Sequence, residues 1–333
     1  MKIRNPFFDL AKGLAVILMI QVHLTELFAR QDIVETTIGK VSLFLGGIPV
    51  APVFLFIMGY FLASSRKNTK ETVIKGVKLF ILGLLLNLGL NAHLLYKIFA
   101  NGVNLNPWNY IFGIDLLIFA GVAIISIAII KNILKNNIIL FIITSILAAC
   151  ATSVLPELKP DNVLGLYFYS LFWGKTTWSY FPVFPWIAYP LAGYTIQLVK
   201  EKVTIKKTIV LASGLLSIFP LMLTAQFGIS SSINLKQYYH HGFYFFIWSL
   251  FFILMWFSAL WLFEHNFPDL LVMKYFKWVG KNVTAFYVVQ WLLIGNIATA
   301  IFKTISLTGL ALWFSAILVM TSVLVLLFNK IQL

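Results

Sequence analysis

The sequence predicts an all-α, polytopic integral membrane protein of about ten transmembrane helices, with both termini on the cytoplasmic side. Three observations predict this class. Of the 333 residues, 60% are hydrophobic and only 11% are charged, whereas a soluble domain is near half apolar and a quarter charged. The apolar residues gather in long runs, and the basic residues lie mainly between alternate runs. So little charge cannot cover a surface that faces water, so lipid must surround most of the chain.

Ten apolar segments are close to the length of about 20 residues that a membrane-spanning helix needs. Their apolar residues are continuous rather than alternating, which argues against a transmembrane barrel. Backbone polar groups in lipid must be satisfied within their own segment, so these runs are predicted to be helices. In chain order they cover residues 8–28, 41–63, 77–95, 108–130, 138–155, 178–199, 209–227, 242–263, 283–301 and 305–328. We expect one transmembrane domain over residues 1–333.

The basic residues support this count and orientation. Of the 25 Lys and Arg residues, 18 fall in the segments predicted to be cytoplasmic. These are Lys2, Arg4, Lys12, Arg66, Lys67, Lys70, Lys75, Lys78, Lys131, Lys135, Lys200, Lys202, Lys206, Lys207, Lys274, Lys277, Lys281 and Lys330. The asymmetry obeys the positive-inside rule, and a missed or invented helix would scramble it.

The net charge of +14 is explained by the same loops. Basic residues anchor cytoplasmic loops to anionic headgroups, so we expect membrane lipid, and not nucleic acid, as the partner. The single cysteine, Cys150, excludes an intramolecular disulfide and a multi-cysteine metal site. The five His residues have no metal-ligand spacing, so no metal is expected.

The first segment carries the best candidates for chemistry. Asp9 and Lys12 lie near its inner end, and Gln21, His23 and Glu26 lie in its outer half. An ionisable group near the bilayer centre costs at least ~2.5 kcal/mol, so each needs a reason. A spacing of three residues puts Asp9 with Lys12, and His23 with Glu26, on shared faces. Lys12 and His23 are separated by about three turns, or ~16 Å, on one face that joins the inner leaflet to the outer half.

His23 is the candidate catalytic base, because an imidazole takes and gives a proton near neutral pH. The alternative is an interhelical hydrogen bond. Glu26 or Asp115 could orient its ring and stabilise the imidazolium, although Asp115 fits a structural salt bridge equally well. Lys12 fits either a phosphate contact or an anchor whose ammonium reaches the headgroups.

Further polar groups fall at a similar outer depth. They are Asn87, Asn91 and His93 in the third segment and the pair His240 and His241 at the start of the eighth. For His93 a position among outer headgroups is the simpler interpretation. The His240–His241 pair fits a solvated loop or a contact to the acceptor equally well.

Prolines mark two unusual segments. Pro49 and Pro52 are predicted to bend or break the second segment, and Pro182, Pro185 and Pro190 do so in the sixth. Broken helices in membranes are tolerated where they line protein or water, so these two segments are candidate cavity walls. The alternative is an ordinary proline kink.

The first segment resembles the opening of the transmembrane acyltransferases. Residues 8–15 read FDLAKGLA and residues 19–23 read MIQVH. In the acyltransferase 3 family an Asp, a basic residue and a Gly precede an apolar stretch that ends in His, with ten residues between the basic residue and the His. Lys12 and His23 fit this spacing, with Lys where Arg is commoner.

Later segments are similar to a sister group, the heparan-alpha-glucosaminide N-acetyltransferase-like proteins. The similar segments read APVFLFIMG at 51–59, LGLLLN at 82–87, FPVFPW at 181–186 and VGKNVTAFY at 279–287. Their order along the chain is a stronger signal than any one of them. Gln290 stands where many relatives carry a His, which argues against a second catalytic histidine there.

The resemblance implies transfer of an acyl group, most simply acetyl, from acetyl-CoA to a hydroxyl or amine of a glycan or similar polar acceptor at the outer face. His23 would activate the acceptor, and Lys12 would lie near the path of the donor. It also implies an integral protein of the bacterial cytoplasmic (inner) membrane.

Two further sets of residues follow from this expectation. Arg66, Lys67, Lys78 and Lys281 are candidates for the phosphates of the coenzyme, with headgroup anchoring as the alternative. The candidates for the acceptor are Trp186, His240, His241 and Asn87. Aromatic side chains such as Trp186 can stack on a sugar, and a position in the interfacial aromatic belt explains them nearly as well.

Two other classes of function stay open at this point. Ten helices, two broken segments and polar groups in the membrane also suit a secondary transporter for a small polar solute. Transporters usually carry paired repeats with matched broken helices, and the two broken segments here have dissimilar sequences. The third option is an assembly factor without chemistry.

Overall fold

The computed structural model describes residues 5–157, 159–204 and 206–331. Lys2 and Arg4, predicted to be cytoplasmic, lie outside this part of the chain. The described residues form 19 helices and two isolated β-bridges, which pair Ala29 with Ile305 and Ile114 with Ser179. The predicted all-α class is confirmed.

Seven helical segments of the described chain are long and apolar enough to cross a membrane. They are Pro6–Leu27, Thr37–Ala63, Thr69–Leu90, Leu116–Leu134, Phe243–Asn266, Val283–Ile301 and Leu307–Ile331. Lys207–Leu223 and Ala225–Ile233 form an eighth candidate that is bent by 82°. Two further predicted spans overlap helices of 17 and 15 residues, Ile138–Val154 and Ala188–Lys202, which are short for a span. The chain is therefore an integral membrane protein, while the count of ten and the orientation of the termini stay predictions.

The described residues cluster into two compact units. The first is drawn from Met1–Val53, Leu88–Leu105 and Met255–Leu333. Its helices are α1 (Pro6–Leu27), α2 (Gln31–Val34), α3 (Thr37–Gly47), α6 (Ala92–Asn101), α17 (Leu271–Lys281), α18 (Val283–Ile301) and α19 (Leu307–Ile331). The predicted organisation as one domain stays a prediction.

The second unit is drawn from Phe54–Asn87 and Asn106–Leu254. It contains most of α4 (Ala51–Ala63) and α5 (Thr69–Leu90) and half of α16 (Phe243–Asn266), which cross the boundary. The rest are α7 (Pro107–Ile111), α8 (Leu116–Leu134), α9 (Ile138–Val154), α10 (Val163–Phe172), α11 (Val183–Trp186), α12 (Ala188–Lys202), α13 (Lys207–Leu223), α14 (Ala225–Ile233) and α15 (Leu235–Tyr239).

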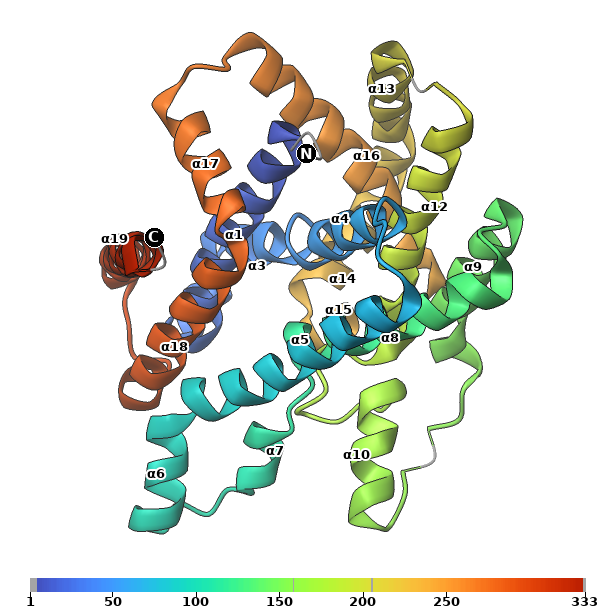
Figure 1. Ribbon diagram of the computed structural model, residues 1–333. Coiled ribbons are helices and arrows are strands. Elements are labelled where there is room, and N and C mark those ends of the chain that lie inside the picture. The colour runs from blue at the N-terminus through green and yellow to red at the C-terminus, as the bar shows by residue number, and fades with distance from the viewer. Residues whose placement is uncertain (1–4, 158, 205, 332–333) are drawn as a thin grey trace. The chain divides into compact units, whose positions relative to one another are not determined.

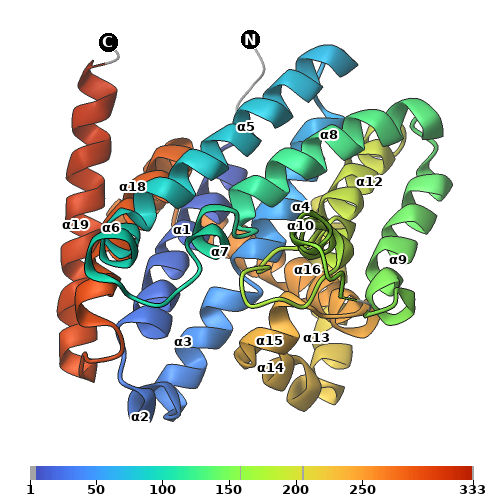
Figure 2. The ribbon, with the colours of Figure 1, turned by 90° about the horizontal axis from the view of Figure 1, so that it is seen from below.

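Helix α1 is the centre of the first unit. The Asn5 side chain caps it by accepting from the Phe7 N–H at 3.1 Å, and Pro6 occupies the first turn, where a missing N–H does no harm. The helix packs against α3, α17, α18 and α19. Figure 1 shows α17 and α18 beside α1, and Figure 2 shows α19 alongside α18. A helix that is covered on several sides by protein can hold polar groups that lipid would exclude.

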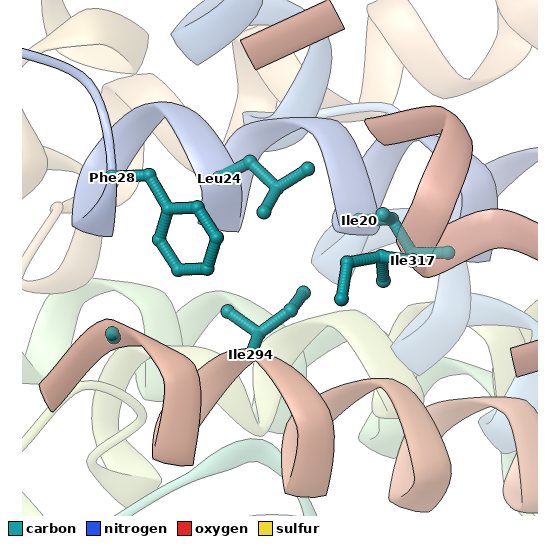
Figure 3. Close-up of a cluster of buried hydrophobic side chains, with 6 residues drawn as sticks. Ile20, Leu24, Phe28, Ile294 and Ile317 are labelled. Carbon is teal, nitrogen blue, oxygen red and sulfur yellow. The ribbon is translucent and has the colours of Figure 1, made fainter. Parts of the chain in front are cut away.

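Three of these helices share one apolar cluster (Figure 3). Ile20 and Leu24 of α1, and Phe28 directly after its end, meet Ile294 of α18 and Ile317 of α19, and all five are buried. In a bilayer the tails are as apolar as these side chains, so close packing rather than expulsion of water holds the helices together. The cluster fixes the C-terminal half of α1 against α18.

The predicted proline breaks are present. Helix α3 ends at Gly47 and α4 begins at Ala51, on either side of Pro49. In the second unit, α11 has a non-helical residue at Phe184, and α12 begins only at Ala188. Proline removes a backbone donor and clashes with the preceding turn, which accounts for both breaks.

Candidate active site

The N-terminal end of α1 holds a partly buried ion pair. The Lys12 ammonium lies 2.9 Å from the Asp9 carboxylate, and the Asp9 side chain is almost completely buried. This is the pairing that the spacing of three residues predicts. Because Asp9 lies in the first turn, its charge also favours the helix N-terminus.

Two glycines bring α1 and α17 into backbone contact beside this pair. A Cβ at Gly13 would overlap the carbonyl oxygen of Phe276, and a Cβ at Gly280 would overlap the carbonyl oxygen of Asp9. Only glycine allows both approaches. Lys281 follows Gly280 directly and is exposed. Its backbone therefore lies next to the point where α17 contacts Asp9.

Farther along α1, His23 and Glu26 form a second pair. Their side chains are 14% and 16% exposed, and the His23 Nδ1 atom lies 3.6 Å from the Glu26 Oε2 atom. This separation is longer than a hydrogen bond and short enough for an ion pair when the imidazole is protonated. The pair can therefore stabilise an imidazolium that forms during proton transfer.

The rotation of α1 is fixed from the side opposite His23. Gln21 donates to the Ser42 carbonyl at 2.9 Å and accepts from the Ser42 hydroxyl at 2.5 Å, and Thr25 bonds that hydroxyl at 2.6 Å. Gln21 and Thr25 are four residues apart and share the face toward α3. His23, two residues from each, projects from a different face.

Trp291 of α18 covers His23. The indole and imidazole centroids are 4.0 Å apart, and the ring planes differ by 38°. Sequence reasoning missed this residue, although its neighbour Gln290 was noted as a departure from related sequences. The sequence showed only an aromatic residue beside a polar one in an apolar segment. A position in the aromatic belt at the membrane interface explains such a residue equally well.

Three buried polar atoms around this ring contact make no hydrogen bond to any described residue. They are His23 Nδ1, Trp291 Nε1 and Gln290 Oε1. The Gln290 amide does donate to the Met19 sulfur at 3.1 Å, and Met19 lies one turn before His23 on α1. Each unsatisfied buried polar atom costs about 1–3 kcal/mol. These atoms lie on facing parts of α1 and α18, and a group that donates or accepts hydrogen bonds there would lower this cost.

In the second unit, Asn87 secures the start of α8. Its side chain is buried and donates to the carbonyls of Ile111, at 3.1 Å, and Gly113, at 2.8 Å. The Ile114 N–H donates to the Trp178 carbonyl at 2.7 Å. Asp115 follows at the N-cap position of α8. The segment that carries Asp115 is thus held from two sides.

Trp186 and His241 lie in a buried aromatic cluster. Trp186 is completely buried and donates from Nε1 to the Tyr239 carbonyl at 2.8 Å. His241 Nε2 lies 2.9 Å from the Tyr189 hydroxyl, and its Nδ1 lies 2.7 Å from the Tyr238 carbonyl. Both ring nitrogens of His241 therefore have partners within the protein. His241 lies two residues before the start of α16.

The two histidines before α16 are held neutral. Burial, together with the positive charges of Lys175 and Lys236, lowers the pKa of His240 to about 4 against an opposing contribution from Glu157. Burial also lowers the pKa of His241 to about 4, against an opposing contribution from the Tyr238 carbonyl. At neutral pH neither ring carries a charge.

The candidate cofactor contacts divide between the units. Arg66 and Lys67 lie on the exposed connection between α4 and α5, and Lys78 is exposed on α5. Lys131 donates to the Lys67 carbonyl at 3.4 Å, which adds a further basic residue to this connection. Lys281 is in the first unit, together with Lys12, His23 and Glu26. Within the described residues, no group of three or more His, Cys, Asp or Glu could hold a metal ion.

Comparison with known proteins gives one match. A family model described as "Heparan-alpha-glucosaminide N-acetyltransferase, catalytic" matches residues 4–226, which is more than half of the chain. No curated protein and no solved structure matches the chain. The matched range contains His23, Glu26, Asp115 and Trp186, and it ends before α16 begins.

Proposed function

The chain belongs to the heparan-alpha-glucosaminide N-acetyltransferase catalytic family, and from this membership we propose that it moves an acetyl group from acetyl-CoA to a hydroxyl or amine of a glycan at the outer face of the membrane. The family makes it an acetyltransferase-type enzyme with multiple apolar helices. The donor, the side of the acceptor and a bacterial cytoplasmic membrane as its location are parts of the proposal.

The partly buried His23–Glu26 pair carries this proposal. His23 accepts the proton of the attacking hydroxyl or amine as the oxygen or nitrogen bonds to the acetyl carbonyl carbon. Glu26, 3.6 Å from Nδ1, stabilises the imidazolium. The carbon–sulfur bond then breaks, and the coenzyme thiolate leaves and takes the proton back from His23. An acetyl-histidine intermediate would use the same imidazole as the nucleophile.

The basic residues near the predicted cytoplasmic ends of the helices are the proposed binding groups for the acyl donor. Coenzyme A carries several phosphate charges, which Lys and Arg bind by charge-assisted hydrogen bonds. Arg66, Lys67 and Lys78 are exposed, as is Lys281 beside the Asp9–Lys12 pair. Within the first unit we assign Lys281 to the coenzyme phosphates and Lys12 to the path of the donor toward His23. Arg66, Lys67 and Lys78 of the second unit stay predicted phosphate contacts.

For the acceptor we assign the polar and aromatic groups of the second unit. Asp115, fixed at the start of α8, keeps its predicted role as a catalytic partner, with a structural salt bridge as the alternative. Asn87 and the Trp186–His241 cluster support the surrounding backbone. His240, neutral and mostly buried, is the remaining acceptor candidate.

The test is acetyl transfer by the purified full chain in lipid nanodiscs, with radiolabelled acetyl-CoA and a mixture of amino sugars and neutral oligosaccharides. His23→Ala should abolish transfer while leaving the melting temperature unchanged. His265→Ala is the matched control, because His265 is an exposed histidine of α16 that stacks on Trp261 instead. Full activity of His23→Ala would overturn the proposal. Gradient-dependent solute uptake without acetyl transfer would favour the transporter alternative.

A further inference from the structure

The indole N–H of Trp291 is a buried donor without a partner in the described part of the chain. Tryptophan can only donate through this atom, so a ligand that satisfies it must supply an acceptor. The same ring system stacks on His23 at a centroid distance of 4.0 Å. The unsatisfied donor therefore lies beside the proposed catalytic base.

The packing of α18 does not depend on this N–H. The Asn296 side chain donates to the Gly89 carbonyl and accepts from the His93 N–H, with distances of 2.8 and 2.9 Å. At the other end of the helix, Asn282 accepts from Asn329 at 3.0 Å. Ile294 adds its contact to the apolar cluster in Figure 3. These contacts hold α18 against its neighbours and leave the Trp291 N–H available.

We propose that Trp291 is a catalytic residue that donates from Nε1 to the oxygen of the acyl group during transfer. The inference rests on the proposed function. As the acceptor oxygen or nitrogen bonds to the carbonyl carbon, its proton passes to His23 and the π pair of the carbonyl moves onto the oxygen. The negative oxygen accepts from Trp291. When the electron pair on the oxygen re-forms the carbonyl double bond, the carbon–sulfur bond breaks and the thiolate takes the proton from His23.

The geometry suits this division of roles. A base and an oxyanion donor must both lie within about 3 Å of a single reacting group, and the Trp291 and His23 rings are close enough for this, with their centroids 4.0 Å apart. A donor held in a dry site needs no reorganisation when charge develops, so it stabilises the transition state more than the substrate. Trp291 lies outside the matched residues 4–226, so family membership does not assign this role.

The test compares two replacements that keep an aromatic ring and remove the donor. Trp291→Phe retains a stacking ring, and benzothienylalanine, introduced at position 291 by codon reassignment, retains the full indole shape with sulfur in place of N–H. Both should lower kcat for acetyl transfer by about 10²–10³-fold. KM for acetyl-CoA should stay within about twofold, because the lost bond forms in the transition state. If Trp291 had only a structural role, the benzothienylalanine variant, which keeps the indole shape, would retain its kcat.

Trp313→Phe is the matched control. Trp313 lies in the same unit, is also partly buried, and packs edge-on against Phe28 instead of His23. The Trp313→Phe variant should have the same kcat as the wild-type protein. If the benzothienylalanine variant retains kcat within about threefold while His23→Ala is inactive, this inference is wrong and the proposed function stands. If His23→Ala is fully active, the proposed function fails first.

Discussion

The Nδ1 atom of His23 lies 3.6 Å from the Oε2 atom of Glu26, and both side chains are largely buried in the first unit. At this distance the carboxylate acts on the imidazole through its charge rather than through a hydrogen bond. The interaction is therefore weak while the ring is neutral and strong once the ring has accepted a proton. This difference favours the transition state over the resting state.

Replacing that carboxylate should slow acetyl transfer. Glu26→Gln keeps the shape and removes the charge, so the imidazolium loses about 1–2 kcal/mol of stabilisation, and kcat should fall about 5- to 30-fold. Steady-state kinetics at saturating acetyl-CoA measure this change. Glu35→Gln, at an exposed glutamate of the same unit, should keep full activity. An unchanged kcat for Glu26→Gln would exclude a role for this charge.

The glycine crossing of α1 and α17 should be sensitive to a single methyl group. In Gly280→Ala the new Cβ would overlap the Asp9 carbonyl oxygen. Overpacking of this kind costs about 1–3 kcal/mol, so thermal unfolding in detergent should shift to lower temperature. Gly242→Ala is the control, because its Cβ would make only an ordinary contact with Ser153. Equal melting temperatures for the two variants would contradict the tight crossing.

Acid should destabilise the loop before α16. The pKa of His240 is lowered by burial to about 4 in the folded protein, whereas an unfolded histidine has a pKa of about 6.5. As the pH falls below about 6.5, the unfolded chain binds the proton first, so stability is lost between pH 6.5 and 4. One such group contributes a slope of about 1.4 kcal/mol per pH unit.

Thermal melts across this pH range measure the loss. His240→Asn removes the titrating ring and should flatten the fall in melting temperature relative to the unchanged chain. His265→Asn, at an exposed histidine, should leave the slope as it is. A slope that is the same in all three proteins would show that His240 is protonated freely in the folded state.

The basic residues assigned to the coenzyme should matter only for donors that carry its phosphates. Arg66→Ala with Lys67→Ala should raise KM for acetyl-CoA about tenfold or more, because each charge-assisted hydrogen bond contributes about 1.5–3 kcal/mol. Acetyl-pantetheine lacks the phosphates of the nucleotide. The KM of the same variant for this donor should therefore equal that of the wild-type protein. Lys330→Ala, also exposed, serves as the control. An equal rise in KM for both donors would point to misfolding instead.

The pairs on α1 were predictable because helix geometry is local. Asp9 with Lys12 and His23 with Glu26 follow from a spacing of three residues, and the structure contains both contacts. The breaks at Pro49 and in α11 were predictable for the same reason, since proline acts on its own turn. The number of spans was less certain from the sequence. Helix α9 has 17 residues, and α13 and α14 are bent by 82°, so apolar length alone does not count crossings.

The amino-acid sequence by itself determined the helical membrane class, the polar face of α1 and the resemblance to a family of acetyltransferases. Each of these depends on composition or on residues within a few turns of one another. Only the tertiary structure placed Trp291 on His23 and joined Gln290 to Met19, which is 271 residues away. Contacts across such a separation are set by which helix faces pack together. A single apolar segment does not encode that choice, because lipid and a neighbouring helix are equally apolar surroundings.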